Sequence, residues 1–166
     1  MSFEISRLCR RELVTIAEQA SVRDAAVLMC ESHVGALVVV DDAQPPRVRG
    51  LVTDRDLALD VLGRDEPRTS LRIGELAKGP PVSVRARAGL GEAVDAMQRS
   101  GVRRLLVVDD EGGVLGLVAA EDLMAAVSDE LAGLVRALRS GIARERGERG
   151  VFERLGGMRP VFHTME

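Results

Sequence analysis

A threonine and a run of charged residues stand where a β-branched segment gives way to a helical pattern. Thr53 ends the segment Val48–Thr53, and Asp54–Asp56 open the next one. A hydroxyl group beside the free N–H groups of a helix start can bind a phosphate. The carboxylate of Asp56 returns to the same cleft and can accept two hydrogen bonds from a ribose diol. The same spacing also suits a simple helix cap, and these residues support the two interpretations equally.

Two other motifs are weaker guides to chemistry. Cys30 and His33 have the spacing of half a metal site, but no second pair exists, so we interpret them as a buried thiol and a surface imidazole and expect no metal. Gly89 and Gly91 resemble the start of a dinucleotide-binding turn, but Val94 replaces the third glycine, which indicates an ordinary helix start. The sequence has no serine elbow, phosphate loop or HExxH motif, so we expect no enzyme.

The segment around Thr53 belongs to a unit that occurs twice. Val14–Asp42 aligns with Val82–Asp110 at a constant offset of 68 residues, with 11 identities in 29 positions. After a two-residue deletion, Val48–Leu57 aligns with Val114–Leu123, with six identities in ten. A duplicated unit of this size is one supersecondary element that needs its twin to cover its apolar face. The cleft between the two copies is therefore the first place to look for function.

Each copy has the hydrophobic pattern β-α-β-β-α, and the fold class we predict is α+β. Ser21 is an N-cap candidate for the first helix, with Asp24 completing a capping box. In copy one we expect strands at Leu13–Ile16, Ala36–Val40 and Val48–Thr53, and helices at 22–32 and Asp54–Leu62. In copy two we expect strands at Val82–Val84, Leu105–Val108 and Val114–Val118, and helices at Leu90–Arg99 and from Ala120 onward, after a short helical turn at Ile73–Ala77.

The second copy continues beyond the end of the first. An apolar stripe from Leu123 to Ile142 predicts a helix several turns longer than its counterpart. We place the boundaries at 1–67 for the first repeat with its N-terminal segment, 68–128 for the second, and 129–166 for the helical extension and tail. The tail Val151–Glu166 holds two of the three phenylalanines, so we expect it to dock, as a short helix followed by an extended strip.

Composition narrows the class of protein further. Hydrophobic residues make up 46% and charged residues 30% of 166 residues, with a net charge of −3, which is typical of a globular protein without general attraction to nucleic acid or membranes. The chain has two cysteines and no apolar leader, so we expect a cytoplasmic protein. In the Arg-rich segment Arg144–Arg154 acidic residues alternate with arginines, which favours ion pairing over contact with nucleic acid.

At this point the chain resembles a known family. Two β-α-β-β-α units, with VVVDD and LVVDD followed by GLVTDRDL and GLVAAEDL, are similar to a pair of CBS domains, or Bateman module, over roughly Leu8 to Val127. The resemblance implies two repeats packed around a pseudo-twofold axis, with adenosine-containing ligands bound in two clefts. It also implies specific roles: Asp56 holds the ribose hydroxyls, Thr53 and Arg55 address phosphate, and Asp54 belongs to the same ribose and phosphate set. The base pocket would be formed by Thr15, Ile16, Val34, Gly35 and Ala36.

The second copy departs from this pattern. Asp122 matches Asp56, but Ala119 stands in place of Thr53 and Glu121 in place of Arg55. That site loses a hydroxyl and gains a negative charge. The resemblance implies a compensating basic pair before the central strand, and the expected second site consists of Asp122, Arg103, Arg104, Ser83 and Val102. The alternative for the two arginines is an exposed strand edge. We expect the first copy to provide the better site.

The resulting expectation is a stand-alone regulatory module that responds to an adenosine nucleotide. AMP is the ligand we expect first, with ATP, NAD and S-adenosylmethionine as alternatives, and no cofactor is required. The module would signal to a separate effector protein and form a homodimer, without membrane or nucleic acid as partner. Two other classes stay open: a structural or interaction protein with vestigial clefts, and a nucleic-acid binder acting through the Arg-rich C-terminal segment.

Overall fold

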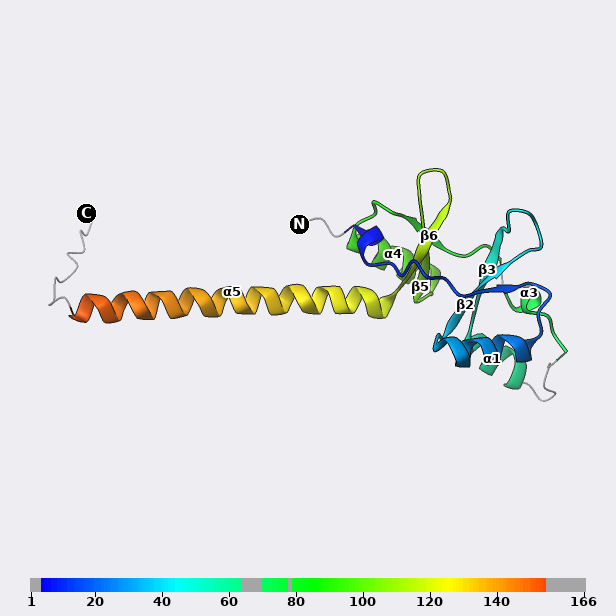
Figure 1. Cartoon of the computed structure of the whole chain (residues 1–166), viewed down its shortest axis with the longest axis horizontal. Coiled ribbons are helices and arrows are strands. Elements are labelled where there is room, and N and C mark those ends of the chain that lie inside the picture. The colour runs from blue at the N-terminus through cyan, green and yellow to red at the C-terminus, as the bar shows by residue number, and fades with distance from the viewer. Residues whose placement is uncertain (1–3, 64–69, 78, 155–166) are drawn as a thin grey trace. The chain divides into compact units, whose positions relative to one another are not determined.

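The computed structural model of the chain describes residues 4–63, 70–77 and 79–154 (Figure 1). The chain divides into two compact units, Met1–Leu123 and Met124–Glu166, which are described separately below. The first unit contains both sequence repeats, and the second contains most of one long helix.

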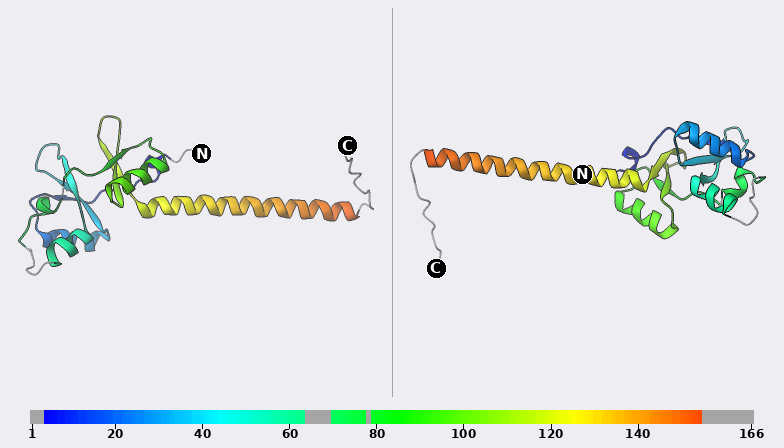
Figure 2. Two further views of the ribbon diagram at one scale, coloured as in Figure 1. Left: turned by 180° about the vertical axis from the view of Figure 1, so that it is seen from behind. Right: turned by 90° about the horizontal axis from the view of Figure 1, so that it is seen from below.

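The first repeat is a three-stranded mixed sheet with helical segments. Its strands are β1 (Thr15–Ala17), β2 (Ala36–Val40) and β3 (Val48–Thr53), in the order β1-β2-β3, with β1 parallel and β3 antiparallel to β2. Helix α1 (Val22–Ser32) connects β1 and β2, and its N-terminus has the predicted capping box. The single turn α2 (Asp54–Asp56) and the π-helical segment η2 (Leu57–Leu62) follow β3. Figures 1 and 2 show α1 and η2 lying side by side.

The second repeat reproduces this arrangement with the same register. Its sheet contains β4 (Ser83–Arg85), β5 (Arg104–Val108) and β6 (Val114–Ala119), and α4 (Leu90–Ser100) connects β4 and β5. Ala36 pairs with Thr53 in the first repeat, and Arg104 pairs with Ala119 in the second. The α+β class and the two tandem β-α-β-β-α repeats are therefore confirmed. In each copy the residue opposite the first residue of the central strand is the last residue of the final strand, directly before the helix that follows.

Some predicted boundaries were wrong. The first strand of each repeat begins later than expected, at Thr15 and Ser83, and the residues directly before them, Val14 and Val82, accept hydrogen bonds from Val38 and Leu106. The helix expected at Asp54–Leu62 is one α-helical turn followed by a π-helix, in which the N–H of Gly63 donates to the carbonyl of Ala58. Cys30 is exposed on α1, so its interpretation as a buried thiol was also wrong.

Each repeat has its own apolar core, and the central strand crosses it. Leu37, Val38 and Val39 of β2 are 0–2% exposed, as are the aligned Leu105, Leu106 and Val107 of β5. Three successive residues at the centre of each run are therefore buried, so both faces of the central strand are covered. The aligned positions are buried in both copies.

The segment that precedes each repeat packs on the other repeat. Ile5, in the 3-10 turn η1 (Ile5–Arg7), is fully buried in the second repeat's core, whereas Ile73 and Leu76 of helix α3 (Ile73–Leu76) are buried in the first repeat's core. The same offset of 68 residues relates Ile5 to Ile73 and Leu8 to Leu76. This exchange joins the two repeats into one unit, since neither core is complete without residues that precede the other copy.

The exchanged segments explain the glycine at the start of each closing phrase. A Cβ at Gly50 would lie 2.8 Å from the Cβ of Ala77, and a Cβ at Gly116 would lie 2.6 Å from the carbonyl oxygen of Arg10. Arg10 also exchanges backbone hydrogen bonds with Leu117 at 2.8 and 3.0 Å. Both glycines are buried, so they allow the incoming backbone to lie directly against the sheet.

Helix α5 (Ala120–Arg154) is a continuous helix of 35 residues that begins after β6. Its first residues close the second repeat, and the remainder forms the second unit. The predicted extension is confirmed, and the helix runs farther than the stripe, to Arg154. Residues 155–166, which hold most of the tail expected to dock, lie outside the described part of the chain. Within the residues described, no helix is long and apolar enough to cross a membrane.

Candidate functional site

Thr53 and Asp56 form a complete capping box at the end of β3. The Asp56 Oδ2 atom accepts hydrogen bonds from the Thr53 N–H at 2.8 Å and from the Thr53 hydroxyl at 2.7 Å. In return, the Asp56 N–H donates to Thr53 Oγ1 at 3.2 Å. The hydrogen bonds that the capping interpretation requires are therefore present. The cap does not exclude binding, because it uses only one carboxylate oxygen.

The second carboxylate oxygen of Asp56 faces no hydrogen-bond donor of the described residues. Within the described residues Asp56 Oδ1 accepts no hydrogen bond, and the half-buried side chain lines a cleft. The box fixes the rotamer of the carboxylate, since both the Thr53 N–H and its hydroxyl hold the same oxygen. A carboxylate held in this way presents a pre-oriented acceptor to a diol at little further entropic cost.

We call this the basic cleft, because three arginines and one carboxylate line it. Its volume is about 510 Å³, within the range of pockets that hold small-molecule ligands. Arg55 comes from the first repeat; in the second, Arg104 is the first residue of β5 and Arg103 directly precedes it. The lining residues are Leu51, Thr53, Arg55, Asp56, Leu76, Gly101, Val102, Arg103 and Arg104. The structure thus joins the ribose and phosphate residues predicted for the first copy with basic residues that had been assigned to the second.

A second cleft has the opposite charge balance, and we call it the acidic cleft. It has a volume of about 220 Å³, less than half that of the basic cleft. Three carboxylates, of Glu12, Glu121 and Asp122, line it together with two guanidinium groups, of Arg10 and Arg104. Its lining residues are Arg10, Glu12, Leu13, Val14, His33, Val34, Gly35, Ala36, Val38, Arg104, Leu117, Ala119, Glu121 and Asp122. Arg104 therefore lies between the two clefts and lines both.

In the second copy the residue that matches Asp56 has both oxygens engaged. Asp122 Oδ2 accepts a hydrogen bond from the Ala119 N–H at 2.9 Å, as in the first copy. Asp122 Oδ1 accepts from Nε and Nη2 of Arg10, both at 3.4 Å. The N-terminal segment brings Arg10 to this position by pairing with Leu117. The carboxylate oxygen that has no partner among the described residues in the basic cleft thus corresponds to an oxygen bonded to the Arg10 guanidinium group in the acidic cleft.

Part of the base-pocket set predicted for the first copy adjoins Thr53, since Ala36 pairs with Thr53 and the Asp54 N–H donates to the Gly35 carbonyl at 3.3 Å, but it lines the other cleft. Val34, Gly35 and Ala36 line the acidic cleft, together with the end of β6. Thr15 is exposed on β1, and Ile16 is 8% exposed in the first repeat's core; neither lines either cleft. The residues predicted for the first-copy site are therefore divided between the two clefts. Each cleft is lined by elements of both repeats.

Three further predicted residues, Asp54, Ser83 and Val102, differ in their relation to the clefts. Asp54 approaches the turn at Gly35, where a Cβ would lie 3.1 Å from Asp54 Oδ2 and 3.2 Å from Arg104 Nη2. A side chain at position 35 would therefore crowd both charged groups. Ser83 is exposed on β4, pairs with Leu106 in the parallel ladder, and lines neither cleft. Val102 lines the basic cleft beside Arg103.

Sequence reasoning missed Arg10 as a site residue. The available signal was the extension of the 68-residue offset to Ile5 and Leu8, which relates the N-terminal segment to the α3 segment. No pattern in the sequence says that each segment crosses to the other repeat. In the described part of the chain, no group of three or more His, Cys, Asp or Glu side chains could hold a metal ion.

Comparison with known proteins gives a consistent result. A family model for the CBS domain matches residues 5–63 and 73–129. The chain is 33% identical over 127 residues to the CBS domain-containing protein YhcV of Bacillus subtilis, covering 74% of this chain and 84% of YhcV. It is 28% identical to an uncharacterised protein of Methanopyrus kandleri, covering 74% of this chain, and it spans 62% of the length of that relative.

Solved structures show the same similarity. A CBS domain protein of Pyrobaculum aerophilum, solved in complex with AMP, superimposes with a TM-score of 0.67 at 26% identity. The match covers 79% of this chain and 99% of that protein.

Proposed function

The chain belongs to the CBS-domain family, and from this premise we propose that it is a regulatory module that binds an adenosine nucleotide in the basic cleft. One observation carries the proposal: a pre-oriented carboxylate and three guanidinium groups line the same cleft. The carboxylate suits a ribose diol, and the guanidinium groups suit phosphate. A nucleotide presents both groups, a diol on its sugar and a phosphate attached to the same sugar.

The charges determine how the nucleotide would be oriented. Asp56 Oδ1 would accept hydrogen bonds from the ribose hydroxyls, while Arg103 and Arg104 would hold the phosphate with Arg55. With three cations and one anion, the cleft attracts a phosphate and repels an additional carboxylate. Thr53 acts mainly by holding Asp56 in position, because its hydroxyl donates to Asp56 Oδ2. Its role is therefore positioning the carboxylate rather than direct contact with phosphate.

The adenine would lie against aliphatic side chains. Leu51, Leu76 and Val102 supply the large apolar part of the cleft lining. The chain has three phenylalanines and no tryptophan or tyrosine, and the described residues that line the basic cleft include no aromatic side chain. Affinity for the base therefore comes from apolar burial and backbone hydrogen bonds, and not from aromatic stacking. This assignment replaces the base pocket expected at Val34–Ala36.

AMP is the ligand we propose first. The protein of Pyrobaculum aerophilum that superimposes on this chain was solved with AMP. A cleft of about 510 Å³ can accommodate a mononucleotide, and one phosphate is enough to engage the two arginines at the start of β5. ATP, NAD and S-adenosylmethionine are the alternatives, and they differ in the charge they would place beside Arg103 and Arg104.

We propose that the acidic cleft does not bind a nucleotide in the wild-type chain. Its carboxylates outnumber its arginines, and Arg10 occupies the free oxygen of Asp122. Ala119 also lacks the hydroxyl group that holds the aspartate in the first copy. The expected stoichiometry is one nucleotide per chain. The module would then signal to an effector protein and act without catalysis.

Mass spectrometry of small molecules released from the purified protein tests the proposal without assuming the ligand. Protein prepared without added nucleotide is denatured, and the extract is compared with that of an Asp56→Ala variant. We expect an adenosine compound in the wild-type extract or, if it dissociates during purification, a higher melting temperature on adding AMP, ATP, NAD or S-adenosylmethionine. If the wild-type protein gives neither an adenosine compound in the extract nor a higher melting temperature with any of these ligands, the sensor function is contradicted. That result would favour an interaction protein with vestigial clefts.

A further inference from the structure

Helix α5 carries a long apolar stripe that is exposed to solvent. Seven large apolar side chains along it are 39–64% exposed, whereas the core residues of both repeats are below 10%. They are Met124, Val127, Leu131, Leu134, Val135, Leu138 and Ile142. Soluble chains seldom leave this much contiguous apolar surface exposed unless it binds a partner.

The spacing of the stripe is that of a helix that packs on another helix. Met124, Val127, Leu131, Leu134 and Leu138 alternate in steps of three and four, which are the a and d positions of a heptad repeat. Val135 and Ile142 broaden the stripe at the e position. At 1.5 Å per residue the stripe from Met124 to Ile142 is about 27 Å long. This length gives a partner helix several turns of continuous contact.

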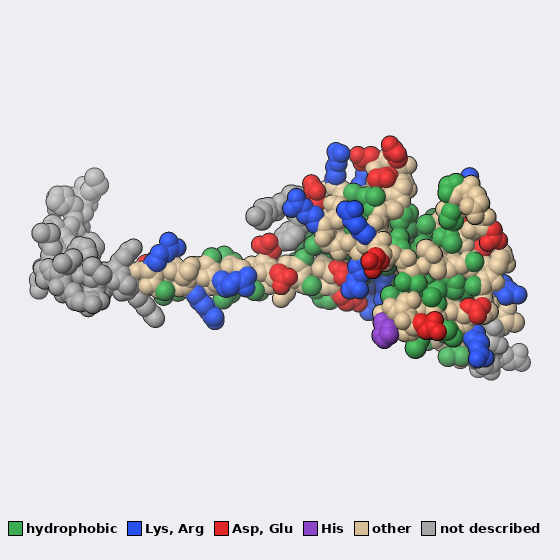
Figure 3. Space-filling model, in the orientation of Figure 1, with side chains coloured by type: hydrophobic (Ala, Val, Ile, Leu, Met, Phe, Trp, Pro, Cys, Tyr) green, Lys and Arg blue, Asp and Glu red, His purple; other side chains and the backbone are tan. Residues whose placement is uncertain are grey.

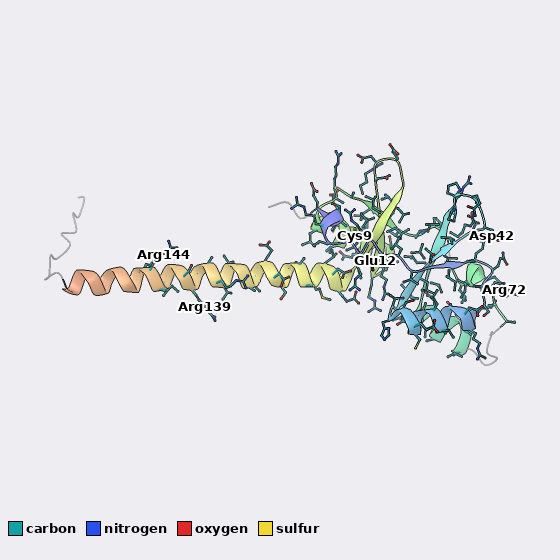
Figure 4. All side chains as sticks on the ribbon, in the orientation of Figure 1. Cys9, Glu12, Asp42, Arg72, Arg139 and Arg144 are labelled. Atoms are coloured by element: carbon teal, nitrogen blue, oxygen red, sulfur yellow. The ribbon has the colours of Figure 1, made fainter. Side chains whose placement is uncertain are left out.

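The charges of α5 are separated along its axis. Before Val135 the charged residues of the helix are all acidic: Glu121, Asp122, Asp129 and Glu130. From Arg136 to Arg144 they are all basic, namely Arg136, Arg139 and Arg144, and Glu145 follows. Figure 3 shows this succession of red and then blue side chains along the helix, and Figure 4 labels Arg139 and Arg144. The helix is thus acidic over the first part of the stripe and basic over the second.

We propose that the stripe is covered by α5 of a second copy of this chain, running antiparallel. In that direction the acidic half of each helix lies beside the basic half of the other, whereas a parallel pair would place like charges at the same level. The helix dipoles are also opposed in the antiparallel pair. The a and d positions match in one register, in which Leu131 packs beside Leu134 of the second copy and Val127 beside Leu138.

A second copy fits these features better than an unrelated partner does. The pattern is self-complementary, because reversing the helix exchanges its acidic and basic halves and maps each a position onto a d position. Two copies related by a twofold axis satisfy both requirements with a single surface. The homodimer expected from the sequence therefore acquires a specific interface, which does not depend on whether the clefts bind a nucleotide.

Cysteine crosslinking distinguishes the two directions. Val127→Cys and Leu138→Cys are placed in separate full-length chains that also carry Cys9→Ser and Cys30→Ser. The two chains are mixed and oxidised. We expect a disulfide between the different chains and little between identical ones. In the antiparallel register two copies of position 127 lie about 16 Å apart along the axis, beyond the reach of a disulfide. Disulfides only between identical chains would indicate a parallel pair and overturn the proposal.

Light scattering tests whether the stripe holds the dimer together. We expect the wild-type chain at micromolar concentration to have twice the monomer mass of 17.9 kDa. Leu131→Glu with Leu134→Glu should make it a monomer, while Ser140→Glu with Ala143→Glu, which adds the same charge on the opposite face, should leave the dimer. A monomeric wild type, or a dimer that survives the paired leucine substitution, would overturn the proposal. Hydrogen exchange gives a further contradicting outcome. If the chain is a monomer whose α5 amides exchange rapidly only after removal of residues 155–166, then the chain's own tail covers the stripe and the proposal is wrong.

Discussion

Replacing Asp56 with alanine removes both proposed functions of its carboxylate, the cap and the ligand contact. Oδ2 caps the turn at Thr53, at 2.7 and 2.8 Å from its two donors, and Oδ1 is available to the ligand. Loss of the ligand's hydrogen bonds to a charged acceptor should cost about 1.5–3 kcal/mol of binding free energy. AMP should therefore bind roughly 10- to 150-fold more weakly. Loss of the cap should also lower the free energy of unfolding by about 0.5–2 kcal/mol.

A matched control in the same chain separates affinity from stability. Asp24 forms the same box with Ser21, at 2.7 Å from the hydroxyl and 3.1 Å from the N–H, and it lines neither cleft. Asp24→Ala should lower the melting temperature in the same way but leave the Kd for AMP unchanged in calorimetry. Asp122→Ala should also leave it unchanged. If Asp122→Ala abolishes AMP binding and Asp56→Ala does not, the assignment of the site to the basic cleft is wrong.

Three further predictions concern the charges and the close packing. Arg103→Ala should weaken AMP binding and reduce the salt dependence of the affinity. If the variant binds AMP as tightly as the wild type at both low and high salt, Arg103 does not bind the phosphate. Gly116→Ala should lower the free energy of unfolding by about 1–3 kcal/mol, because its Cβ would meet the Arg10 carbonyl oxygen at 2.6 Å; an unchanged denaturation midpoint would refute the close contact. Hydrogen bonds from Ser21, chiefly from its hydroxyl, lower the pKa of Asp24 below 3.8. The capping box therefore stabilises the fold above that pH, and this stabilisation is lost as the pH falls through the lowered pKa. Asp24→Asn should therefore lose less stability than wild type on acidification through that range, and identical acid profiles would contradict it.

The repeats and their strands could be predicted because the signal is local. Ala36–Val40 and Val48–Thr53 have the predicted bounds, since a β-branched run bounded by turn residues specifies a buried strand. The Ser21 and Thr53 boxes follow from residues three positions apart. The π-helical form of Leu57–Leu62 could not be read from the sequence, because its apolar spacing also fits an α-helix.

The composition of the candidate site was harder to predict, because it depends on contacts between the repeats. Thr53, Arg55 and Asp56 lie in one cleft as expected, but Val34–Ala36 lie in the other. Arg10 reaches Asp122 only because residues before the first repeat pack on the second. Alignment of the two copies gives equivalent positions within each repeat. It does not show which elements of different copies face one another.

Titration calorimetry with AMP measures whether the protein binds a nucleotide and whether the basic cleft is its single site. We expect saturable binding of one AMP per chain, with Asp56→Ala and Arg103→Ala both weakening it and Asp24→Ala leaving it unchanged. Binding of two AMP molecules per chain would contradict the assignment of a single competent cleft. Absence of binding by AMP, ATP, NAD and S-adenosylmethionine to nucleotide-free protein would contradict the nucleotide-sensing function itself.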